Sequence, residues 1–493
     1  MILSQLLNIA ELKIPDSIFD FDVKGLSLDS RKIFEGYIFF SIKGSKTDGR
    51  KYVKQAIDNG AKLVIAESKY QNDYNGIDKI LFVECIRKVM ADISCAFYKN
   101  PSKKMKIVGI TGTNGKTTIS YIIKSIVESA GYSCGLIGTI NYITGKENVE
   151  SAGLTTPDSI QLNRLLAEMV ENGMDYCVME VSSIALTNYR VHNVYFDSAL
   201  FTNLTSEHMD LHNNMEEYFK AKKILFDNLS KENLAISNSD DLYGERILSK
   251  CKGIKKLYSI NANSDLKAEN IRIKLDGLKF NVRYNNKNYS VESTLTGRFN
   301  IYNILAAIQF GIEKGIEIQT ILESIKSFQA AKGRFNRTLL PNRACAIVDY
   351  SHTSDSLKNA IEAAVEVRNS DGKNGRVITI FGCGGDRDKT KRPVMGKIAT
   401  DLSDIVIITS DNPRTENPNE IIKDILVGIK GKSNYRIEVN REEAIRRGIE
   451  ISHEGDIILV CGKGHETYQE VNGVKSHFDD QEIIMQNIEL MKN

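Results

Sequence analysis

An apolar run that breaks into a glycine-rich turn constrains this chain more than any other feature. Ile107, Val108 and Ile110 predict a buried strand, and residues 117–130, with isoleucines at helical spacing, predict a helix directly after the turn. A strand, a glycine loop and a helix N-terminus form a phosphate cradle, because backbone N–H groups then face the anion. We therefore expect ATP to bind at the loop residues Gly112, Thr113, Asn114, Gly115, Lys116, Thr117 and Thr118.

Two side chains of this loop have specific expected roles. Lys116 reaches the terminal phosphates, and the Thr117 hydroxyl is a ligand for Mg²⁺. The loop is shorter than the general pattern, because Ile110 stands five residues before Gly115, where that pattern has glycine. The alternative is a glycine-rich turn with a solvated lysine, and the flanking strand and helix argue against it.

Length, charge and composition exclude several other classes of protein. The 493 residues suggest about three domains. A formal net charge of +2 gives no electrostatic reason to expect nucleic acid or an anionic membrane as the main partner. There is no apolar run of membrane-spanning length, no signal-peptide pattern and no CxxC pair among the eight cysteines. We expect a cytoplasmic monomer that does not insert into membranes.

The order of strands and helices predicts an α/β fold in three domains. Residues 1–103 form a small α/β unit, residues 104–332 contain the phosphate loop, and residues 333–493 form a third unit. We expect a parallel sheet of the P-loop ATPase type in the central unit. Short alternating segments near residues 267–296 predict a smaller antiparallel part.

The third unit contains the same strand-and-loop pattern three times. An apolar strand runs into a loop dense in glycine or charge at residues 377–387, 405–414 and 457–466. Strands that alternate with helices predict a Rossmann-like, doubly wound parallel sheet. Ligands of such sheets bind at the carboxyl ends of the strands, so the third unit is predicted to be a second ligand-binding domain.

A lysine interrupts the apolar stripe of a predicted helix over residues 216–229. Lys222 lies between Tyr218 and Phe226 on this stripe, whereas Lys220 and Lys223 are expected to point elsewhere. A lysine on a buried face is unfavourable unless it is neutralised, paired or modified. A neutral lysine can react with CO₂ to give a carbamate, an anionic oxygen ligand suited to Mg²⁺. Helical geometry alone favours neither this role nor a side chain that reaches water from the edge of the stripe.

Other candidate metal ligands lie between the phosphate loop and Lys222. Glu180 ends a buried strand, where a carboxylate can meet the Mg²⁺ of the loop. Residues 207–212 cluster histidines and acids, including His208, just before the Lys222 helix. Their spacing does not indicate zinc, and a purely structural cluster is the more common alternative.

The loops of the third unit carry residues suited to an amino acid. Arg387 and Arg414 each follow a strand, and arginine grips carboxylates through a planar fork. Glu466 can bind an ammonium group. Together they would suit a zwitterion, although surface ion pairs would give the same pattern.

These motifs occur in an order that resembles the Mur ligases over nearly the whole chain. The resemblance implies that the first domain binds a uridine nucleotide, through segments that include Leu28, Ser30, Ser45, Lys46 and Thr47. It implies that the second domain contacts a muramoyl peptide through Thr155, Thr156, Ser182, Asn188 and Arg190.

The same resemblance assigns the catalytic centre. The pattern Ala221–Phe226 matches the segment that carries a carbamylated lysine in this family, so Lys222 takes that role. The implied catalytic residues are Lys116, Glu180, His208 and Lys222, and the implied metal ligands are Thr117, Glu180, His208 and carbamylated Lys222. Further nucleotide contacts are implied for Asn303, Asp349 and His352.

The resemblance also indicates which amino acid is added. In this family an Asp-Asn-Pro-Arg motif marks members that add meso-diaminopimelate, and here the motif is Asp411–Arg414. The implied amino-acid site is Arg387, Asp411, Asn412, Pro413, Arg414, Gly462 and Glu466. Diaminopimelate has a second carboxylate that lysine lacks, so bound lysine would leave a buried arginine unpaired. A site that hydrogen-bonds a required group of its substrate can reject an analogue lacking that group by about 10⁴-fold.

The implied activity is ATP-dependent amide ligation in peptidoglycan synthesis. Meso-diaminopimelate would be joined to the D-Glu of UDP-N-acetylmuramoyl-L-Ala-D-Glu through an acyl phosphate. Three alternatives stay open: the same reaction with lysine or another diamino acid, a related ligase such as a folylpolyglutamate or cyanophycin synthetase, and a non-catalytic nucleotide-dependent regulator or scaffold. Four departures from the family pattern concern the fit of the peptide substrate: Ile184, Asn188, Asn336 and Ser354.

Overall fold

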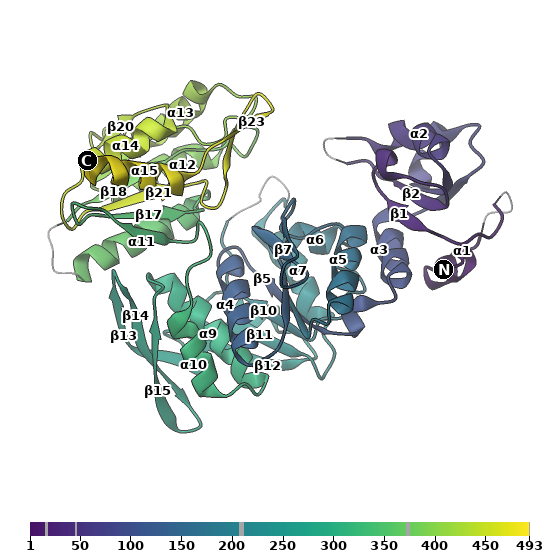
Figure 1. The fold of residues 1–493 in the computed structure, drawn as a ribbon, viewed down its shortest axis with the longest axis horizontal. Coiled ribbons are helices and arrows are strands. Elements are labelled where there is room, and N and C mark those ends of the chain that lie inside the picture. The colour runs from purple at the N-terminus through teal and green to yellow at the C-terminus, as the bar shows by residue number, and fades with distance from the viewer. Residues whose placement is uncertain (15–17, 45–46, 207–211, 371–374, 493) are drawn as a thin grey trace.

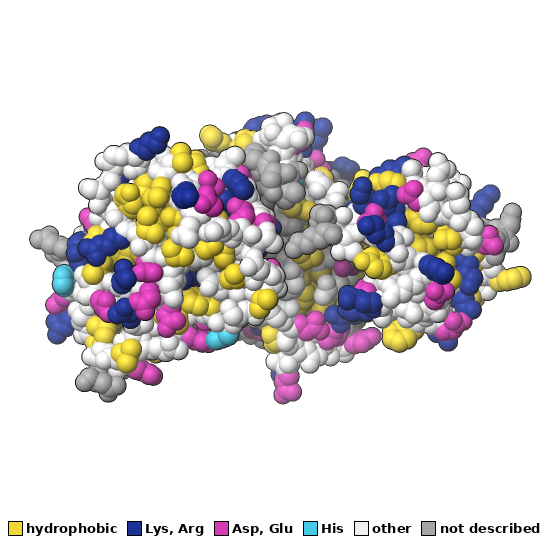
Figure 2. All heavy atoms as spheres, turned by 90° about the horizontal axis from the view of Figure 1, so that it is seen from above, with side chains coloured by type: hydrophobic (Ala, Val, Ile, Leu, Met, Phe, Trp, Pro, Cys, Tyr) yellow, Lys and Arg dark blue, Asp and Glu magenta, His cyan; other side chains and the backbone are white. Residues whose placement is uncertain are grey.

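The computed structural model describes residues 1–14, 18–44, 47–206, 212–370 and 375–492. Three sheet-containing parts follow one another along the molecule, with the N-terminal part at one end and the C-terminal part at the other (Figure 1). Most strand pairs are parallel and helices cover the sheets, so the predicted α/β class is confirmed. On the face shown in Figure 2, basic and acidic side chains are interspersed, in keeping with the small net charge of +2.

The N-terminal sheet has four parallel strands among the described residues. Their order is β1 (Gly25–Ser27), β2 (Tyr37–Ser41), β3 (Ala61–Glu67) and β4 (Ile80–Val83). The accompanying helices are α1 (Leu3–Ile9), α2 (Val53–Asp58) and α3 (Ile86–Phe97). Helix α3 packs against α5 (Ser159–Glu171) of the next part and so joins the two.

The central sheet has eleven strands among the described residues. Their spatial order is β15 (Lys287–Ser293), β14 (Gly277–Tyr284), β13 (Leu266–Lys274), β12 (Ile254–Ser259), β11 (Leu234–Asn238), β10 (Ser198–Phe201), β5 (Lys106–Thr111), β9 (Tyr176–Glu180), β6 (Cys134–Ile137), β7 (Asn141–Ile143) and β8 (Val149–Ser151). From β12 to β6 the strands run parallel to one another, whereas β6, β7 and β8 pair antiparallel at the other edge. Strands β13, β14 and β15 form an antiparallel extension, which confirms the prediction for residues 267–296.

The phosphate loop lies between the central strand β5 and helix α4 (Lys116–Ser129). Side chains alternate along β5: Val108 and Ile110 join the apolar core under α4, whereas Ile107 belongs to the core on the other face. The predicted isoleucine stripe of α4 is almost fully buried against the first of these cores. Burial on both faces fixes β5 in the sheet and therefore fixes where the loop begins. The remaining central helices are α6 (Ser183–Thr187), α7 (Met215–Asp227), α8 (Gly244–Ile247), α9 (Arg298–Glu313) and α10 (Ile318–Ser327).

The C-terminal sheet has six strands among the described residues. Their order is β16 (Asn336–Leu339), β17 (Cys345–Asp349), β21 (Ile457–Cys461), β18 (Val377–Phe381), β19 (Ile405–Ile408) and β20 (Tyr435–Ile437). Only β16 is antiparallel to its neighbour in this described sheet, so the doubly wound arrangement is present. The helices are α11 (Ser354–Ser370), α12 (Lys391–Leu402), α13 (Pro418–Leu426), α14 (Arg441–Glu450) and α15 (Asp480–Lys492), and β22 (Tyr468–Val471) with β23 (Val474–His477) forms a hairpin.

A buried ion pair joins two helices to the end of β21. The guanidinium of Arg441 lies 2.7 Å from each carboxylate oxygen of Asp480, and it donates to the Cys461 carbonyl at 3.0 Å. Both side chains of the pair are inaccessible to solvent. Removing one partner of such a pair leaves an uncompensated buried charge.

We expect Asp480→Ala to lower the free energy of unfolding of the C-terminal part by about 3–5 kcal/mol. Urea denaturation followed by circular dichroism measures the change. Glu482→Gln is the matched control, because Glu482 pairs with His477 at the surface, where the loss should stay below about 1 kcal/mol. Equal effects of the two substitutions would contradict the stabilising role of the buried pair.

Candidate active site

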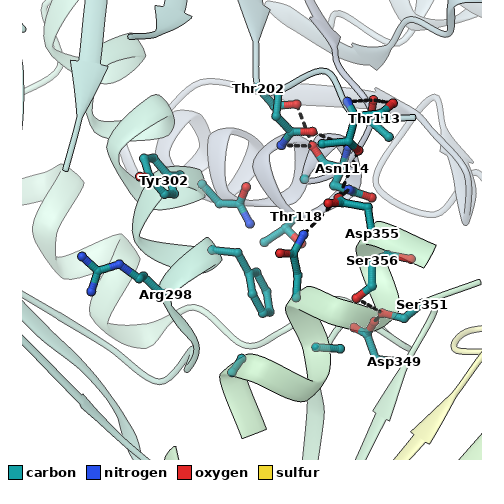
Figure 3. A pocket seen from close by; sticks show the side chains of 18 of the residues that line it. Thr113, Asn114, Thr118, Thr202, Arg298, Tyr302, Asp349, Ser351, Asp355 and Ser356 are labelled. Atoms are coloured by element: carbon teal, nitrogen blue, oxygen red, sulfur yellow. Dashed lines mark hydrogen bonds between the residues drawn. The ribbon is translucent and has the colours of Figure 1, made fainter. Parts of the chain in front are cut away.

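A cavity of about 1110 Å³ is lined by both the central and the C-terminal parts (Figure 3). Helix α11 packs on β13 and α9, so the C-terminal sheet is held close to the phosphate loop. The predicted site residues that line this cavity are Thr113, Asn114, Gly115, Lys116, Thr117, Thr118, Thr155, Glu180, Asn303, Asp349 and His352. The sequence therefore predicted a set of residues that the fold brings together.

The phosphate loop curls around the ammonium group of its own lysine. Lys116 Nζ donates to the carbonyls of Gly112 at 2.9 Å and Thr113 at 2.7 Å. Gly115 adopts a φ of +89°, and a Cβ there would lie 2.5 Å from Asn303 Oδ1. Glycine is required at this turn because both the backbone conformation and the neighbouring side chain exclude a larger residue.

Lys222 faces the phosphate loop from helix α7. Its side chain is only 2% exposed, so the alternative in which it reaches water from the edge of the stripe is wrong. Its Nζ donates to the Gly112 carbonyl at 2.9 Å and lies 4.3 Å from the centre of the Tyr218 ring. Lys223 does point elsewhere, toward Asp227, but it is also buried.

Glu180 places a buried carboxylate beside the loop. Its Oε1 accepts from the Thr139 N–H at 2.9 Å, and its Oε2 accepts from the Thr139 hydroxyl at 3.0 Å. Glu180 and Thr117 line the same cavity, and their oxygen atoms are the type of ligand that Mg²⁺ prefers. Predicted His208 lies outside the described residues, and within the described ranges no three His, Cys, Asp or Glu side chains form a metal cluster.

Three predicted muramoyl-peptide residues form one network at the end of β9. The Thr156 hydroxyl donates to the Glu180 carbonyl at 2.9 Å and accepts from the Ser182 N–H at 3.1 Å. Arg190 donates to the Thr156 carbonyl at 2.8 Å. Thr155 joins through Thr139, since the two hydroxyl oxygens are 3.1 Å apart. Asn188, at the end of α6, is linked by its backbone N–H to the Ile184 carbonyl at 2.9 Å.

The described uridine residues Leu28, Ser30 and Thr47 lie on the N-terminal part and do not line the described cavity. The Ser30 hydroxyl donates to Gln55 at 2.8 Å, Leu28 is partly exposed beside it, and Thr47 is exposed. Ser45 and Lys46 lie outside the described residues. In Figure 1, helices α5 and α6 lie between the N-terminal part and β5, the strand that leads into the phosphate loop.

Two contacts that cross between the sheets were missed by the sequence prediction. Arg334 donates to the Thr117 hydroxyl at 3.0 Å, and its guanidinium stacks 4.6 Å from the centre of the Tyr350 ring. Asp355 accepts from the Asn114 side-chain amide at 2.7 Å, as Figure 3 shows. The Gly333-Arg334 pair at the start of the third unit could have identified Arg334 as a site residue. No sequence pattern identifies Asp355.

The predicted nucleotide residues from the C-terminal part are fixed by local bonds. Asp349 accepts from the Phe335 N–H at 2.8 Å and from the Ser351 hydroxyl. Burial raises the pKa of the Asp349 carboxyl, against the opposing effect of the Ser351 hydrogen bond. His352 Nδ1 lies 2.9 Å from the Tyr350 carbonyl oxygen, and on the central side Asn303 donates to Asn300 at 2.9 Å.

The three strand-end loops of the C-terminal sheet meet at one edge, as predicted. Asn412 donates from its side-chain amide to Glu466 Oε2 at 2.7 Å, and Arg414 donates to the Gly385 carbonyl at 2.7 Å. Gly462 has a φ of +117°, and a Cβ there would lie 2.4 Å from Asp411 Oδ2. The other predicted members are Pro413, whose carbonyl accepts from the Glu416 N–H at 3.0 Å, and exposed Arg387, which donates to Asp386.

His465 lies between this edge and the nucleotide residues. Its ring is 4.8 Å from the Tyr350 ring, centre to centre, and its Nδ1 is buried without a hydrogen-bond partner in the described part of the chain. Burial lowers the pKa of His465 to about 3, and the nearby Arg334 cation acts in the same direction. The imidazole is therefore neutral at physiological pH.

Comparisons with known proteins agree with this geometry. Three family models match in succession: the Mur ligase family catalytic domain at residues 22–98, the middle domain at 110–311 and the glutamate ligase domain at 333–464. The chain is 45% identical to the UDP-N-acetylmuramoyl-L-alanyl-D-glutamate–2,6-diaminopimelate ligase of Clostridium botulinum over 94% of either chain. The chain belongs to the Mur ligase family.

Solved structures of Mur ligases have the same fold. A structure of a UDP-N-acetylmuramoyl-L-alanyl-D-glutamate–2,6-diaminopimelate ligase is 31% identical, with a TM-score of 0.69 and complete coverage of both chains. The MurF ligase from Thermotoga maritima in complex with ADP is 16% identical, with a TM-score of 0.64 and coverage of 97% of this chain and 99% of that one. This Mur ligase is an ATP-dependent ligase, which confirms the predicted enzyme class. Among its described helices, none is both long and apolar enough to cross a bilayer.

The neutral His465 makes the stability of this Mur ligase depend on pH. The unfolded chain takes up a proton at His465 below its ordinary pKa of 6.5, whereas the folded chain does so only near pH 3. The free energy of unfolding should therefore fall as the pH decreases from about 6.5 toward 3, by up to about 1.4 kcal/mol per pH unit for one group. Urea denaturation at several pH values should give a shallower slope for His465→Gln. Exposed His453→Gln is the control, and a wild-type slope in His465→Gln would contradict the prediction.

Proposed function

We propose that this Mur ligase joins meso-diaminopimelate to the D-Glu γ-carboxylate of UDP-N-acetylmuramoyl-L-Ala-D-Glu, with ATP converted to ADP and phosphate. The observation that supports this most is that the Asp411–Arg414 loop meets the Gly385 and Glu466 loops at one sheet edge. A relative of 45% identity over nearly its whole length bears the name of this activity. We place the reaction in the cytoplasm, where peptidoglycan precursors are made.

The three parts of the chain share the three substrates in this proposal, and the UDP-muramoyl peptide spans the first two parts. Residues 1–103 bind the uridine nucleotide, residues 104–332 bind ATP and the muramoyl peptide, and residues 333–493 bind the amino acid. The cavity between the second and third parts contains the phosphate loop, so the chemistry takes place there. Bringing three substrates to one point favours closure of the parts before reaction.

The donor set beside the phosphate loop fits Mg²⁺. Thr117 and Glu180 supply oxygen atoms to the same cavity, and we propose His208 and carbamylated Lys222 as further ligands. The buried Nζ of Lys222 is directed at the loop. The oxygens of a carbamate on this nitrogen would therefore face the loop as well. When bound, Mg²⁺ neutralises phosphate charge as a Lewis acid.

The reaction proceeds in two steps. The D-Glu carboxylate attacks the γ-phosphorus of ATP, the bond to the β,γ-bridging oxygen breaks, and an acyl phosphate and ADP result. The diaminopimelate amine then attacks the acyl carbon, and the tetrahedral intermediate expels phosphate and loses a proton as the amide forms. Lys116 places its ammonium against the transferring phosphoryl group, so the loop acts by positioning and charge neutralisation.

The C-terminal loops hold the amino acid in this scheme. Arg387 and Arg414 take carboxylates through bidentate hydrogen bonds. Glu466 takes an ammonium group, and its carboxylate is held in place by Asn412 and Lys463. A side chain fixed in this way is preorganised for its ligand, which improves both affinity and discrimination.

We expect phosphate release with UDP-N-acetylmuramoyl-L-Ala-D-Glu, ATP and Mg²⁺ in the presence of meso-diaminopimelate but not of L-lysine. Arg414→Gln should reduce kcat/KM for diaminopimelate by about 10³–10⁴-fold, because a half-buried hydrogen-bonding partner of the second carboxylate is lost. Arg436→Gln is the matched control, since Arg436 is exposed on edge strand β20. Malachite-green detection of phosphate measures all combinations.

Other results of this assay would select among the alternatives. Turnover with lysine would keep the ligase and reject the Arg414 selectivity. Failure to bind any UDP-muramoyl peptide would favour a ligase with another acceptor. ATP binding without turnover under any combination would favour a regulatory or scaffolding protein.

A second prediction concerns the proposed carbamate. Lys222→Ala should lose at least about 10²-fold in kcat, and added acetate or formate should restore part of it by supplying the missing anionic oxygen. Lys220→Ala on the same helix is the control, because Lys220 is exposed and should leave kcat unchanged. An inactive Lys222→Ala protein with native circular dichroism and no carboxylate rescue would reject the carbamate.

A further inference from the structure

A fully buried arginine lies behind the two loops that carry Arg387 and Arg414. Arg392, in the first turn of α12, is 0% exposed. Its Nη2 donates to Glu416 Oε1 at 2.9 Å, and its Nη1 donates to Glu416 Oε2 at 3.0 Å. This two-bond fork is the most rigid way in which an arginine holds a carboxylate.

The same pair contacts both loops. Arg392 also donates to the Gly384 carbonyl at 3.2 Å, and Glu416 Oε1 accepts from the Asp386 N–H at 2.6 Å. Glu416 itself belongs to the other loop, two residues after Arg414. Arg392 holds the pKa of the Glu416 carboxyl down at about 2, so this carboxylate is charged at any pH at which the enzyme is handled.

Both loops adopt backbone conformations that need external support. Asp386 has a φ of +53° and Arg414 a φ of +52°, in the left-handed region that residues with a Cβ rarely adopt. Asp386 directly precedes Arg387, and Arg414 itself adopts this conformation. Each disfavoured backbone conformation therefore sets the direction of one of the two arginine side chains. Such conformations persist where the surroundings fix them. The bonds from Arg392 and Glu416 to Gly384 and Asp386 support the first loop. The Arg414 backbone is held by its N–H, which donates to the Glu470 carbonyl at 3.0 Å, and by its carbonyl, which accepts from the Asn472 N–H at 2.6 Å.

The loops also touch one another directly, so a change in one moves the other. The Thr415 hydroxyl donates to Asp386 Oδ1 at 2.8 Å. A Cβ at Gly385 would lie 1.9 Å from the Pro413 carbonyl oxygen, which shows how closely the two backbones approach. The relative position of Arg387 and Arg414 thus depends on this contact and on the pair behind it.

We propose that Arg392 and Glu416 are positioning residues that set the separation of Arg387 and Arg414 and thereby the selectivity for a dicarboxylic amino acid. The proposal rests on the proposed function, because it concerns the amino acid bound at that site. Diaminopimelate presents two carboxylates and requires both arginines at one fixed separation. Lysine presents one carboxylate, so its binding depends less on that separation. Misplacement of a binding group by about 1 Å can reduce the rate about 10²-fold.

The test compares Glu416→Gln with Asp424→Asn. Asp424, on α13, also accepts from Arg392, at 2.8 Å, but it is 44% exposed and forms no hydrogen bond with either loop among the described residues. We expect Glu416→Gln to raise the KM for diaminopimelate about 10- to 100-fold and to lower the preference for diaminopimelate over lysine. The KM for ATP should stay within about twofold, and Asp424→Asn should resemble the wild type. Arg392→Lys, which keeps the charge without the fork, should lie between them.

Amide hydrogen exchange gives a readout that does not require turnover. The segment 384–387 should exchange faster in Glu416→Gln than in Asp424→Asn, because the Asp386 N–H loses its charged acceptor. If the wild-type protein fails to use diaminopimelate, the proposed function is rejected, while the exchange comparison still tests the positioning pair. Unchanged KM, selectivity and exchange in Glu416→Gln, or equal effects in both variants, would overturn the inference. A loss of kcat with a raised KM for ATP would also overturn it, since that indicates general disruption.

Discussion

Two lysine ammonium groups from different helices converge on one backbone carbonyl, and the active site depends on this arrangement. Lys116 and Lys222 each place Nζ 2.9 Å from the Gly112 carbonyl oxygen. Two ammonium groups beside one carbonyl oxygen repel one another, and next to the buried Lys222 side chain the repulsion is larger than in water because the local dielectric constant is lower. An anion bound beside them lowers this energy. The loop therefore favours negative charge: phosphate groups would lie beside both ammonium groups, and the proposed carbamylation of Lys222 would replace one ammonium with an anion.

The site is completed by residues of a second sheet, which makes nucleotide binding sensitive to how the two halves are placed. Arg334 and Asp355 reach from the C-terminal part to Thr117 and Asn114 of the loop. The arginine adds a cation where phosphate charge is expected, whereas the carboxylate of Asp355 has the same sign as a phosphate. ATP in the loop would weaken the Asp355 contact and strengthen that of Arg334. We therefore expect nucleotide binding and the placement of the two parts to be coupled through these two side chains.

Local sequence patterns predicted the parts of the fold and site that depend on near neighbours. The isoleucine spacing located α4, expected over residues 117–130 and observed at Lys116–Ser129, and the misfit of Lys222 on an apolar stripe identified a lysine that is indeed buried. Asp355 was missed because its partner Asn114 is 241 residues away. Arg392 was missed as well, since its 24-residue separation from Glu416 follows no helical or strand period. Contacts set by tertiary packing leave no periodic trace in a single sequence.

The three loops at the carboxyl edge of the C-terminal sheet have an evolutionary consequence. They are anchored to one another through pairs such as Asn412–Glu466 and Arg414–Gly385, while the phosphate loop belongs to a different sheet. If this edge binds the amino acid as proposed, substitutions there can change which amino acid is added without altering the phosphate loop. Related enzymes can thus come to differ in the amino acid that they add while they keep the same nucleotide-binding part.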